Sequence, residues 1–253
     1  MKNLINWKLF SILLITCVIT SMLVIPYSLA LTSSQVKITP ETLLLSAAQN
    51  LLLFALAIFF GLLLLKHIKI PGMGLPFLTG ALEGKNQAKG LKAILLPSIG
   101  LGVLAGVLII LLDFLFKKFT VELQNIEVSI AAWKAILASF YGGIAEEVLL
   151  RLFMLTLLVW LIFKIIKVKE VSPNDLRVWA AIVLAAVIFG LGHLPATSQI
   201  TDLTVLVVIR AIVLNGVGGI IFGWLYWKKG LESAILAHFS ADIVLHVILP
   251  AIV

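Results

Sequence analysis

Residues 43–65 read LLLSAAQNLLLFALAIFFGLLLL, a stretch of 23 residues that carries no charged side chain. An α-helix rises about 1.5 Å per residue, so this stretch is long enough to cross the hydrocarbon core of a bilayer, which is about 30 Å thick. Its composition is nearly uniform in Leu, Phe and Ala, and we expect most of its surface to contact lipid. The stretch therefore predicts a membrane-spanning helix.

The composition of the whole chain extends this prediction. Of the 253 residues, 62% are hydrophobic and 12% are charged, and the mean hydropathy is +1.18. A soluble domain of about 300 residues buries only about 75% of its chain surface, so it could not hide this much apolar surface from water. The composition excludes a soluble globular enzyme and a disordered chain. The single cysteine, Cys17, excludes a disulfide framework within the chain.

Seven stretches are long and apolar enough, or nearly so, to cross a membrane. We expect an all-α fold, a polytopic transmembrane bundle of about seven to eight helices, because no strand-like alternation competes. The eighth helix, or a re-entrant segment, would lie near Asn215–Gly219. The seven predicted spans are Leu9–Leu31, Leu43–Leu65, Ala93–Phe116, Ile136–Phe163, Val178–Leu194, Leu203–Trp227 and Leu231–Leu249.

Two segments before residue 93 differ from an ordinary membrane span. The first span follows Lys2 and Lys8 and ends near Ser28-Leu29-Ala30, which resembles a signal-peptide cleavage site. Its apolar run is too long for the hydrophobic region of a signal peptide, so we favour an uncleaved helix. The segment 66–92 contains Pro and Gly at 71, 72, 74 and 76, and we expect it to include a short interfacial element.

Lysine and arginine positions predict the orientation. With the N-terminus in the cytoplasm, thirteen of them fall on the cytoplasmic side and four on the other side, which matches the positive-inside rule. We attribute the net charge of +7 to these loops, where it favours anionic lipids on the cytoplasmic face, and we expect no nucleic-acid partner. The cytoplasmic set is Lys2, Lys8, Lys66, Lys69, Lys85, Lys89, Lys92, Lys164, Lys167, Lys169, Arg177, Lys228 and Lys229; the opposite set is Lys37, Lys117, Lys118 and Lys134.

Ionisable residues gather in the last four spans. Such groups are costly at bilayer depth and usually face a cavity or a partner. The first two spans contain none, and Asp113 lies near the end of the third. This clustering places a functional cavity between the C-terminal helices. Its candidates are Glu146, Glu147, Arg151, His193, Arg210, His238, Asp242 and His246.

The two adjacent glutamates are expected to have different roles. Glu147 and Arg151 are four residues apart, share a helix face and can form a structural ion pair. Glu146 points about 100° away from Glu147 and has no obvious local cation. A carboxylate in an apolar cavity can act as a general base or acid, and we favour this role for Glu146.

The histidines form pairs at the same helical spacing. Phe189 and His193 are four residues apart, and so are His238 and Asp242. A carboxylate beside an imidazole selects its tautomer and stabilises its charged form. His193 as a helix-end cap and His246 as an interfacial histidine are the plainer alternatives. For Arg210, pairing with Asp242, pairing with Glu146 and snorkelling stay open.

The depths of these residues do not agree if every helix is straight. At about 1.5 Å per residue, Glu146 lies about 27 Å from Lys164, whereas His238 lies only about 14 Å from Lys229. Helix tilt, a break at Gly142-Gly143 or a sunken turn at Lys228 would bring the two residues to one level.

A carboxylate, two histidines and an orienting acid between helices suit hydrolysis. Glu146 and His193 would activate a water, and His238 would donate to the oxyanion. The set Glu146, His193 and His238 would equally suit a divalent metal such as zinc with an open position for water. A His-Glu-x-x-His helix is absent from the sequence. No cofactor is firmly implied.

With these motifs the chain resembles the CPBP (CAAX prenyl endopeptidase and bacteriocin-processing, or Abi) family of intramembrane proteases. The family pattern is Glu-Glu-x-x-x-Arg, then Phe-x-x-x-His, then His-x-x-x-Asn or Asp. It matches Glu146–Arg151, Phe189–His193 and His238–Asp242 in order and spacing, and Phe222-Gly223-Trp224 also looks like the family's approach to its last motif. The similarity covers roughly residues 135–250. We therefore divide the chain into 1–130, N-terminal helices with a basic cytoplasmic loop, and 131–253, a CPBP-like catalytic core.

The resemblance implies roles for individual residues. Glu146 would be the catalytic glutamate, and His193 would help it to activate water. His238 and Asp242 would form the oxyanion side, with Glu147, Arg151 and Phe189 in support. An anionic Asp242 cannot donate to an oxyanion, so its expected role is to orient His238.

The expected function is an intramembrane endopeptidase acting on a membrane-associated protein or peptide of the CAAX, pheromone or bacteriocin type. Short loops and high lysine content suggest a prokaryotic plasma membrane. Two alternatives stay open at this point: a proton-coupled transporter, and a non-proteolytic immunity or scaffold protein. The restriction of polar residues to one half of the chain counts against a transporter built from repeats.

Overall fold

The computed structural model describes residues 5–32, 39–68, 70–120, 130–167, 171–172 and 174–252. Within these ranges the chain is helical, without strands, and seven helical segments are long and apolar enough to cross a membrane. The protein is a polytopic helical bundle and a multi-pass membrane protein. All seven predicted spans are confirmed, with shifts of a few residues at their ends. They run Trp7–Leu31, Pro40–Leu65, Ala88–Lys117, Ala132–Ile166, Leu176–Thr197, Val205–Lys229 and Leu231–Ile252.

Two of the spans are each divided into two helices by a break next to a proline. The first consists of α1 (Trp7–Leu23) and α2 (Ile25–Thr32), and the break falls at Val24, two residues before Pro26, whose nitrogen cannot donate a helical hydrogen bond. The fifth consists of α8 (Leu176–Gly192) and α9 (Leu194–Thr197), again with a proline just after the break.

The fourth and the seventh spans contain π-helical turns. The fourth runs α6 (Ala132–Phe140), η2 (Tyr141–Glu146), η3 (Val148–Leu155) and α7 (Thr156–Ile166). The seventh runs α11 (Leu231–Ile243), η4 (Val244–Ile248) and α12 (Leu249–Ile252). At the start of α7, the Thr156 hydroxyl donates to the Arg151 carbonyl of η3 at 3.0 Å, which satisfies an acceptor in the widened turn.

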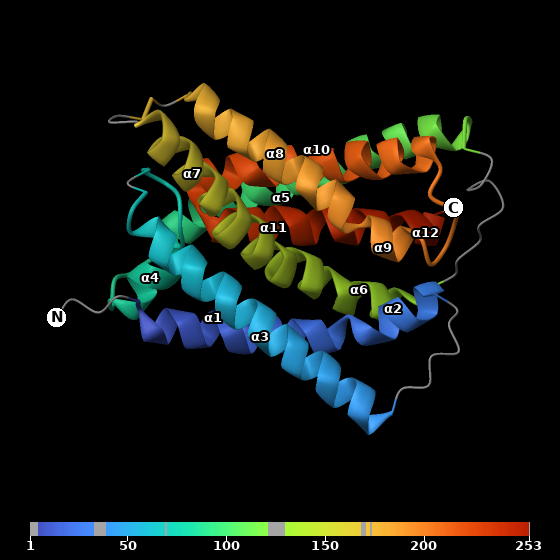
Figure 1. The fold of residues 1–253 in the computed structure, drawn as a ribbon, viewed down its shortest axis with the longest axis horizontal. Coiled ribbons are helices and arrows are strands. Elements are labelled where there is room, and N and C mark those ends of the chain that lie inside the picture. Colours follow the sequence, from blue (N-terminus) through green and yellow to red (C-terminus); the bar gives the residue numbers. More distant parts are fainter. Residues whose placement is uncertain are drawn as a thin grey trace.

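Three spans are continuous helices: α3 (Pro40–Leu65), α5 (Ala88–Lys117) and α10 (Val205–Lys229). The prediction of an extra helix or re-entrant segment near Asn215–Gly219 was wrong, because these residues lie within α10. The short element expected in 66–92 is α4 (Pro76–Leu82). In Figure 1, α2, α9 and α12 lie at one end of the bundle, and α4 lies near the other.

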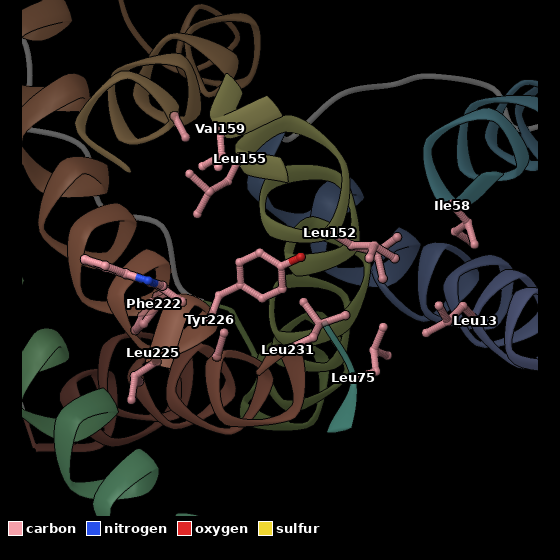
Figure 2. Packing of buried hydrophobic residues seen from close by; sticks show 14 of the residues in the cluster. Leu13, Ile58, Leu75, Leu152, Leu155, Val159, Phe222, Leu225, Tyr226 and Leu231 are labelled. Carbon is pink, nitrogen blue, oxygen red and sulfur yellow. The ribbon is translucent and has the colours of Figure 1, made fainter. Parts of the chain in front are cut away.

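The core surrounds Tyr226 on α10. Its neighbours come from η3, α7, α10 and α11, and Leu13 and Ile58 carry the core onward to α1 and α3 (Figure 2). The Tyr226 hydroxyl lies 2.7 Å from the Thr156 hydroxyl, so its one polar atom is satisfied inside the core. Helices approach most closely at glycines: a Cβ on Gly102 of α5 would collide with the Ala237 carbonyl of α11.

The turn between α10 and α11 is covered by residues 72–78, the segment that leads into α4. The Leu231 amide donates to the Gly74 carbonyl at 2.7 Å, and a Cβ on Gly72 would meet the Trp227 carbonyl at 2.7 Å. The Glu232 carboxylate accepts from the first amides of α4, Phe77 at 3.0 Å and Leu78 at 2.9 Å. Because the turn is covered, counting residues from Lys229 underestimates the depth of His238. The sunken turn therefore accounts for part of the difference in depth between Glu146 and His238 that straight helices would give.

Candidate active site

A cavity of about 770 Å³ opens between helices from both halves of the chain. Its lining runs from Glu146, Phe222 and His238 in the bundle to Lys117 and Leu249 near the helix ends. The expectation of a cavity among the C-terminal helices was therefore incomplete, because α2 and α5 also contribute to its wall. Their contributions are Tyr27 and Leu31 on α2, and Ile109, Ile110, Asp113, Phe114 and Lys117 on α5.

Glu146 and Glu147 lie where the two π-helical segments meet. The Glu146 side chain is 21% exposed and lines the cavity, whereas Glu147 is completely buried. Oε1 of Glu147 lies 3.0 Å from Nη1 of Arg151, whose side chain is also buried. The predicted division between a buried ion pair and a cavity-facing carboxylate is confirmed.

His238 connects these two glutamates. Its Nδ1 lies 2.7 Å from Glu147 Oε1, and its Nε2 lies 3.8 Å from Glu146 Oε2 and 3.6 Å from Asp242 Oδ1. A carboxylate paired with an arginine can only accept, so Nδ1 carries a proton and donates it to Glu147. The residue that orients His238 is therefore Glu147. Asp242, to which this role was assigned, lies beside the other ring nitrogen instead.

Aromatic rings fix the position of His238. Phe222 on α10 stacks on the imidazole at a centroid distance of 4.8 Å, and Phe189 meets it edge-on at 5.9 Å. The Arg151 guanidinium lies over the same two rings, 5.3 Å from Phe189 and 5.6 Å from Phe222. These contacts give Phe189 its supporting position and limit rotation of the ring.

His193 lies in the same cavity but apart from this cluster. Its Nδ1 lies 2.9 Å from the Phe189 carbonyl, and its ring packs edge-on against the Phe189 ring at 4.7 Å. A carbonyl only accepts, so the proton sits on Nδ1 and the lone pair of the neutral ring sits on Nε2. His193 thus reaches the cluster through Phe189 rather than through a direct contact with Glu146 or His238.

Arg210 pairs with neither Asp242 nor Glu146, the two partners considered for it, but with Asp113. It lies 22% exposed at the outer part of the cavity, where its Nε donates to Asp113 Oδ1 at 2.7 Å. Lys117 Nζ lies 3.6 Å from the other oxygen of Asp113. The inner part of the cavity therefore carries the carboxylates of Glu146 and Asp242. Its rim carries two cations, Arg210 and Lys117, and one carboxylate, Asp113.

Sequence reasoning missed two further features of the site. Gly142 lies directly under it, because a Cβ there would collide with the Asp242 carboxylate and lie 3.3 Å from His238 Nε2. Tyr27 on α2 contacts His246, with its hydroxyl 3.3 Å from Nδ1, so His246 belongs to the cavity wall. The glycine pair at 142–143 was a visible signal, whereas no pattern in the first span indicated Tyr27.

The donors suggested for a metal are not drawn together. Among the described residues, no group of three or more His, Cys, Asp and Glu side chains is arranged to hold a metal ion. Glu146 and Asp242 lie beside His238, whereas the ring of His193 packs against Phe189. The residues present therefore do not fit the proposed three-ligand set, and we derive no step through a metal.

Comparison with known proteins supports the family resemblance. Residues 127–244 match the family model described as Rce1-like, type II CAAX prenyl endopeptidase. No curated protein and no solved structure matches the chain. The matched segment contains all three motifs and thus every residue of the cluster around His238. The match covers just under half of the chain and supports the resemblance of this segment to the CPBP family, whose Rce1-like members are type II CAAX prenyl endopeptidases and thus hydrolases.

Proposed function

We propose that this protein is an intramembrane endopeptidase in which Glu146 is the general base. The observation that carries the proposal is the convergence of Glu146, His238 and Asp242 on a cavity of about 770 Å³, with Glu147 and Arg151 buried directly behind them. One carboxylate is thus exposed to a substrate, while its neighbour in sequence is committed to holding the imidazole.

The reaction follows from these positions. Glu146 takes a proton from a water in the cavity, and the resulting hydroxide attacks the carbonyl carbon of the scissile peptide bond. The tetrahedral intermediate collapses when Glu146 returns the proton to the leaving amine. His193, with its Nε2 lone pair, assists in positioning the water.

His238 has the geometry of an oxyanion donor. Its Nδ1–H is already donated to Glu147, so a second N–H, at Nε2, is present only when the ring is an imidazolium. Glu146, Glu147 and Asp242 surround that charge and stabilise it electrostatically. His238 would then donate to the oxygen that becomes negative in the transition state.

The location of the cavity supports a substrate class. A site between membrane-spanning helices favours a membrane-associated protein or peptide, and the family resemblance suggests one of the CAAX, pheromone or bacteriocin type. In this proposal, residues 131–253 supply the chemistry and residues 1–130 supply part of the wall. The basic loops would face the cytoplasm and its anionic lipids, in a prokaryotic plasma membrane with the N-terminus inside.

The test compares peptide termini in membranes that contain wild-type protein or the Glu146→Gln variant at matched levels. We expect defined cleavage products in the wild type and at least a hundredfold loss of them in the variant, since the substitution removes the base but retains the shape. Glu83→Gln, at an exposed position far from the cavity, is the control and should match the wild type.

Identical terminal profiles for wild type and Glu146→Gln would contradict the proposal. A measurement of the melting temperature of both proteins in detergent accompanies the comparison. Equal melting temperatures would assign the loss of products to chemistry and not to unfolding.

A further inference from the structure

Helix α3 packs against the bundle by only one of its faces. Its buried residues lie in its second half, and a Cβ on Gly61 would lie 2.6 Å from the Leu152 carbonyl of η3. In Figure 1, the first half of α3 diverges from the bundle. The buried residues are Phe54, Ala57, Ile58, Gly61, Leu62 and Leu64.

The opposite face of α3 carries a regular seam. Thr42, Leu45, Gln49, Leu52 and Leu56 follow one another at spacings of three and four residues, which is the pattern of a helix that pairs with another helix. These residues are exposed, with Leu45 at 60%, Leu52 at 62% and Leu56 at 49%. Apolar side chains on such a face are compatible with lipid, but an amide is not.

Gln49 is the exposed amide of this seam that lipid alone does not accommodate. It lies nine residues after Pro40, about 13 Å along the helix, so we expect its amide to lie within the hydrocarbon core. Among the described residues, no hydrogen bond to this amide is found. A polar group in hydrocarbon is stabilised when another helix supplies a donor and an acceptor.

We propose that α3 is the interface of a parallel homodimer in which the Gln49 amides of two copies pair across the two-fold axis. Two copies inserted in the same direction have the same residue at the same depth, so a second Gln49 is the partner that symmetry guarantees. An amide is also self-complementary, because it both donates and accepts. The polar position within an apolar seam would set the register of the two helices.

Disulfide trapping in native membranes tests this interface, in a Cys17→Ala background. Leu52→Cys lies on the seam, and Leu51→Cys, exposed at nearly the same depth, lies off it. Leu45→Cys and Leu44→Cys form a second matched pair. After mild oxidation at low expression, we expect at least tenfold more covalent dimer from each seam position than from its neighbour.

The amide itself is tested in the Leu52→Cys protein. Gln49→Leu should lower the dimer yield at least tenfold, and Gln49→Asn should retain most of it, because asparagine keeps the amide. Size-exclusion profiles and melting temperatures confirm that each variant is folded. Equal trapping on and off the seam, an unchanged yield with Gln49→Leu, or an adduct with a protein of different mass would overturn the proposal. None of these outcomes depends on the proteolytic activity.

Discussion

The Glu147 carboxylate connects the ion pair in the core to the ring at the active site. One oxygen, Oε1, lies 3.0 Å from Arg151 Nη1 and 2.7 Å from His238 Nδ1. Burial of this group is tolerated because the positive charge of Arg151 and the N–H of His238 face it from two sides. The position of the imidazole in the cavity therefore depends on charges that no substrate touches.

Replacing Arg151 alone should lower the free energy of unfolding more than replacing both members of the Glu147–Arg151 ion pair. Arg151→Met leaves Glu147 as a buried carboxylate without its cation, and we expect a loss of about 3–5 kcal/mol in the free energy of unfolding. The double variant Glu147→Gln with Arg151→Met should recover part of that loss. Unfolding in detergent, followed for both single variants and the double variant, measures the coupling. Strict additivity would mean that the pair does not act as a unit.

Even the methyl group of alanine at position 142 should reduce activity. A methyl group there displaces Asp242 and crowds His238 Nε2, so Gly142→Ala should lower peptide cleavage at least tenfold. Gly216, which also lies in a helix but faces open space, provides the matched control as Gly216→Ala. The ratio of cleavage rates at equal protein levels is the measurement. Similar rates for the two variants would show that the space under Asp242 is not needed.

The spans were predictable from sequence, whereas the contacts between them were not. Length and apolarity identify a membrane helix because the bilayer imposes both. The rotation and tilt of each helix depend on packing, so the pairing of Arg210 with Asp113 and of His238 with Glu147 had no sequence signal. Pairs within one helix, such as Glu147 and Arg151, were predicted correctly because the helical period determines them.

The start of α8 contains a carboxylate whose titration can be observed. Asp175 caps this helix, and hydrogen bonds from the Arg177 side chain and from backbone amides lower the pKa of Asp175 from 3.8 to about 2. A lowered pKa stabilises the folded state above the unfolded value, and that contribution disappears as the pH falls towards 2. The wild type should therefore melt above Asp175→Asn at neutral pH, and the difference should narrow between about pH 4 and about pH 2. A constant difference in melting temperature would contradict this assignment.

At the scale of the whole molecule, the distribution of charge predicts which way the cavity faces. The rim of the cavity, at Lys117, lies at the end of the bundle opposite the lysine-rich segment around α4. If the positive-inside rule holds, the cavity opens away from the cytoplasm. Four of the lysines used for the orientation, Lys2, Lys37, Lys69 and Lys169, lie outside the described residues.

The two ends of α5 offer a direct test of orientation. In a Cys17→Ala background, Lys89→Cys lies in the first turn of α5 and Lys118→Cys just after its last turn. A membrane-impermeant maleimide added to intact cells should label Lys118→Cys, and should label Lys89→Cys only after permeabilisation. The reverse pattern would place the N-terminus outside and open the cavity to the cytoplasm.

The contrast between Glu146 and Glu147 also bears on how genetic variation in this protein is interpreted. A survey that scores only cell phenotype would rank substitutions at both positions as equally damaging. Scoring cellular abundance beside phenotype should separate them: Glu146 variants would accumulate as inert protein, and Glu147 variants would be degraded. Two adjacent positions would then be under different selection, Glu146 for catalytic activity and Glu147 for the stability of the folded protein.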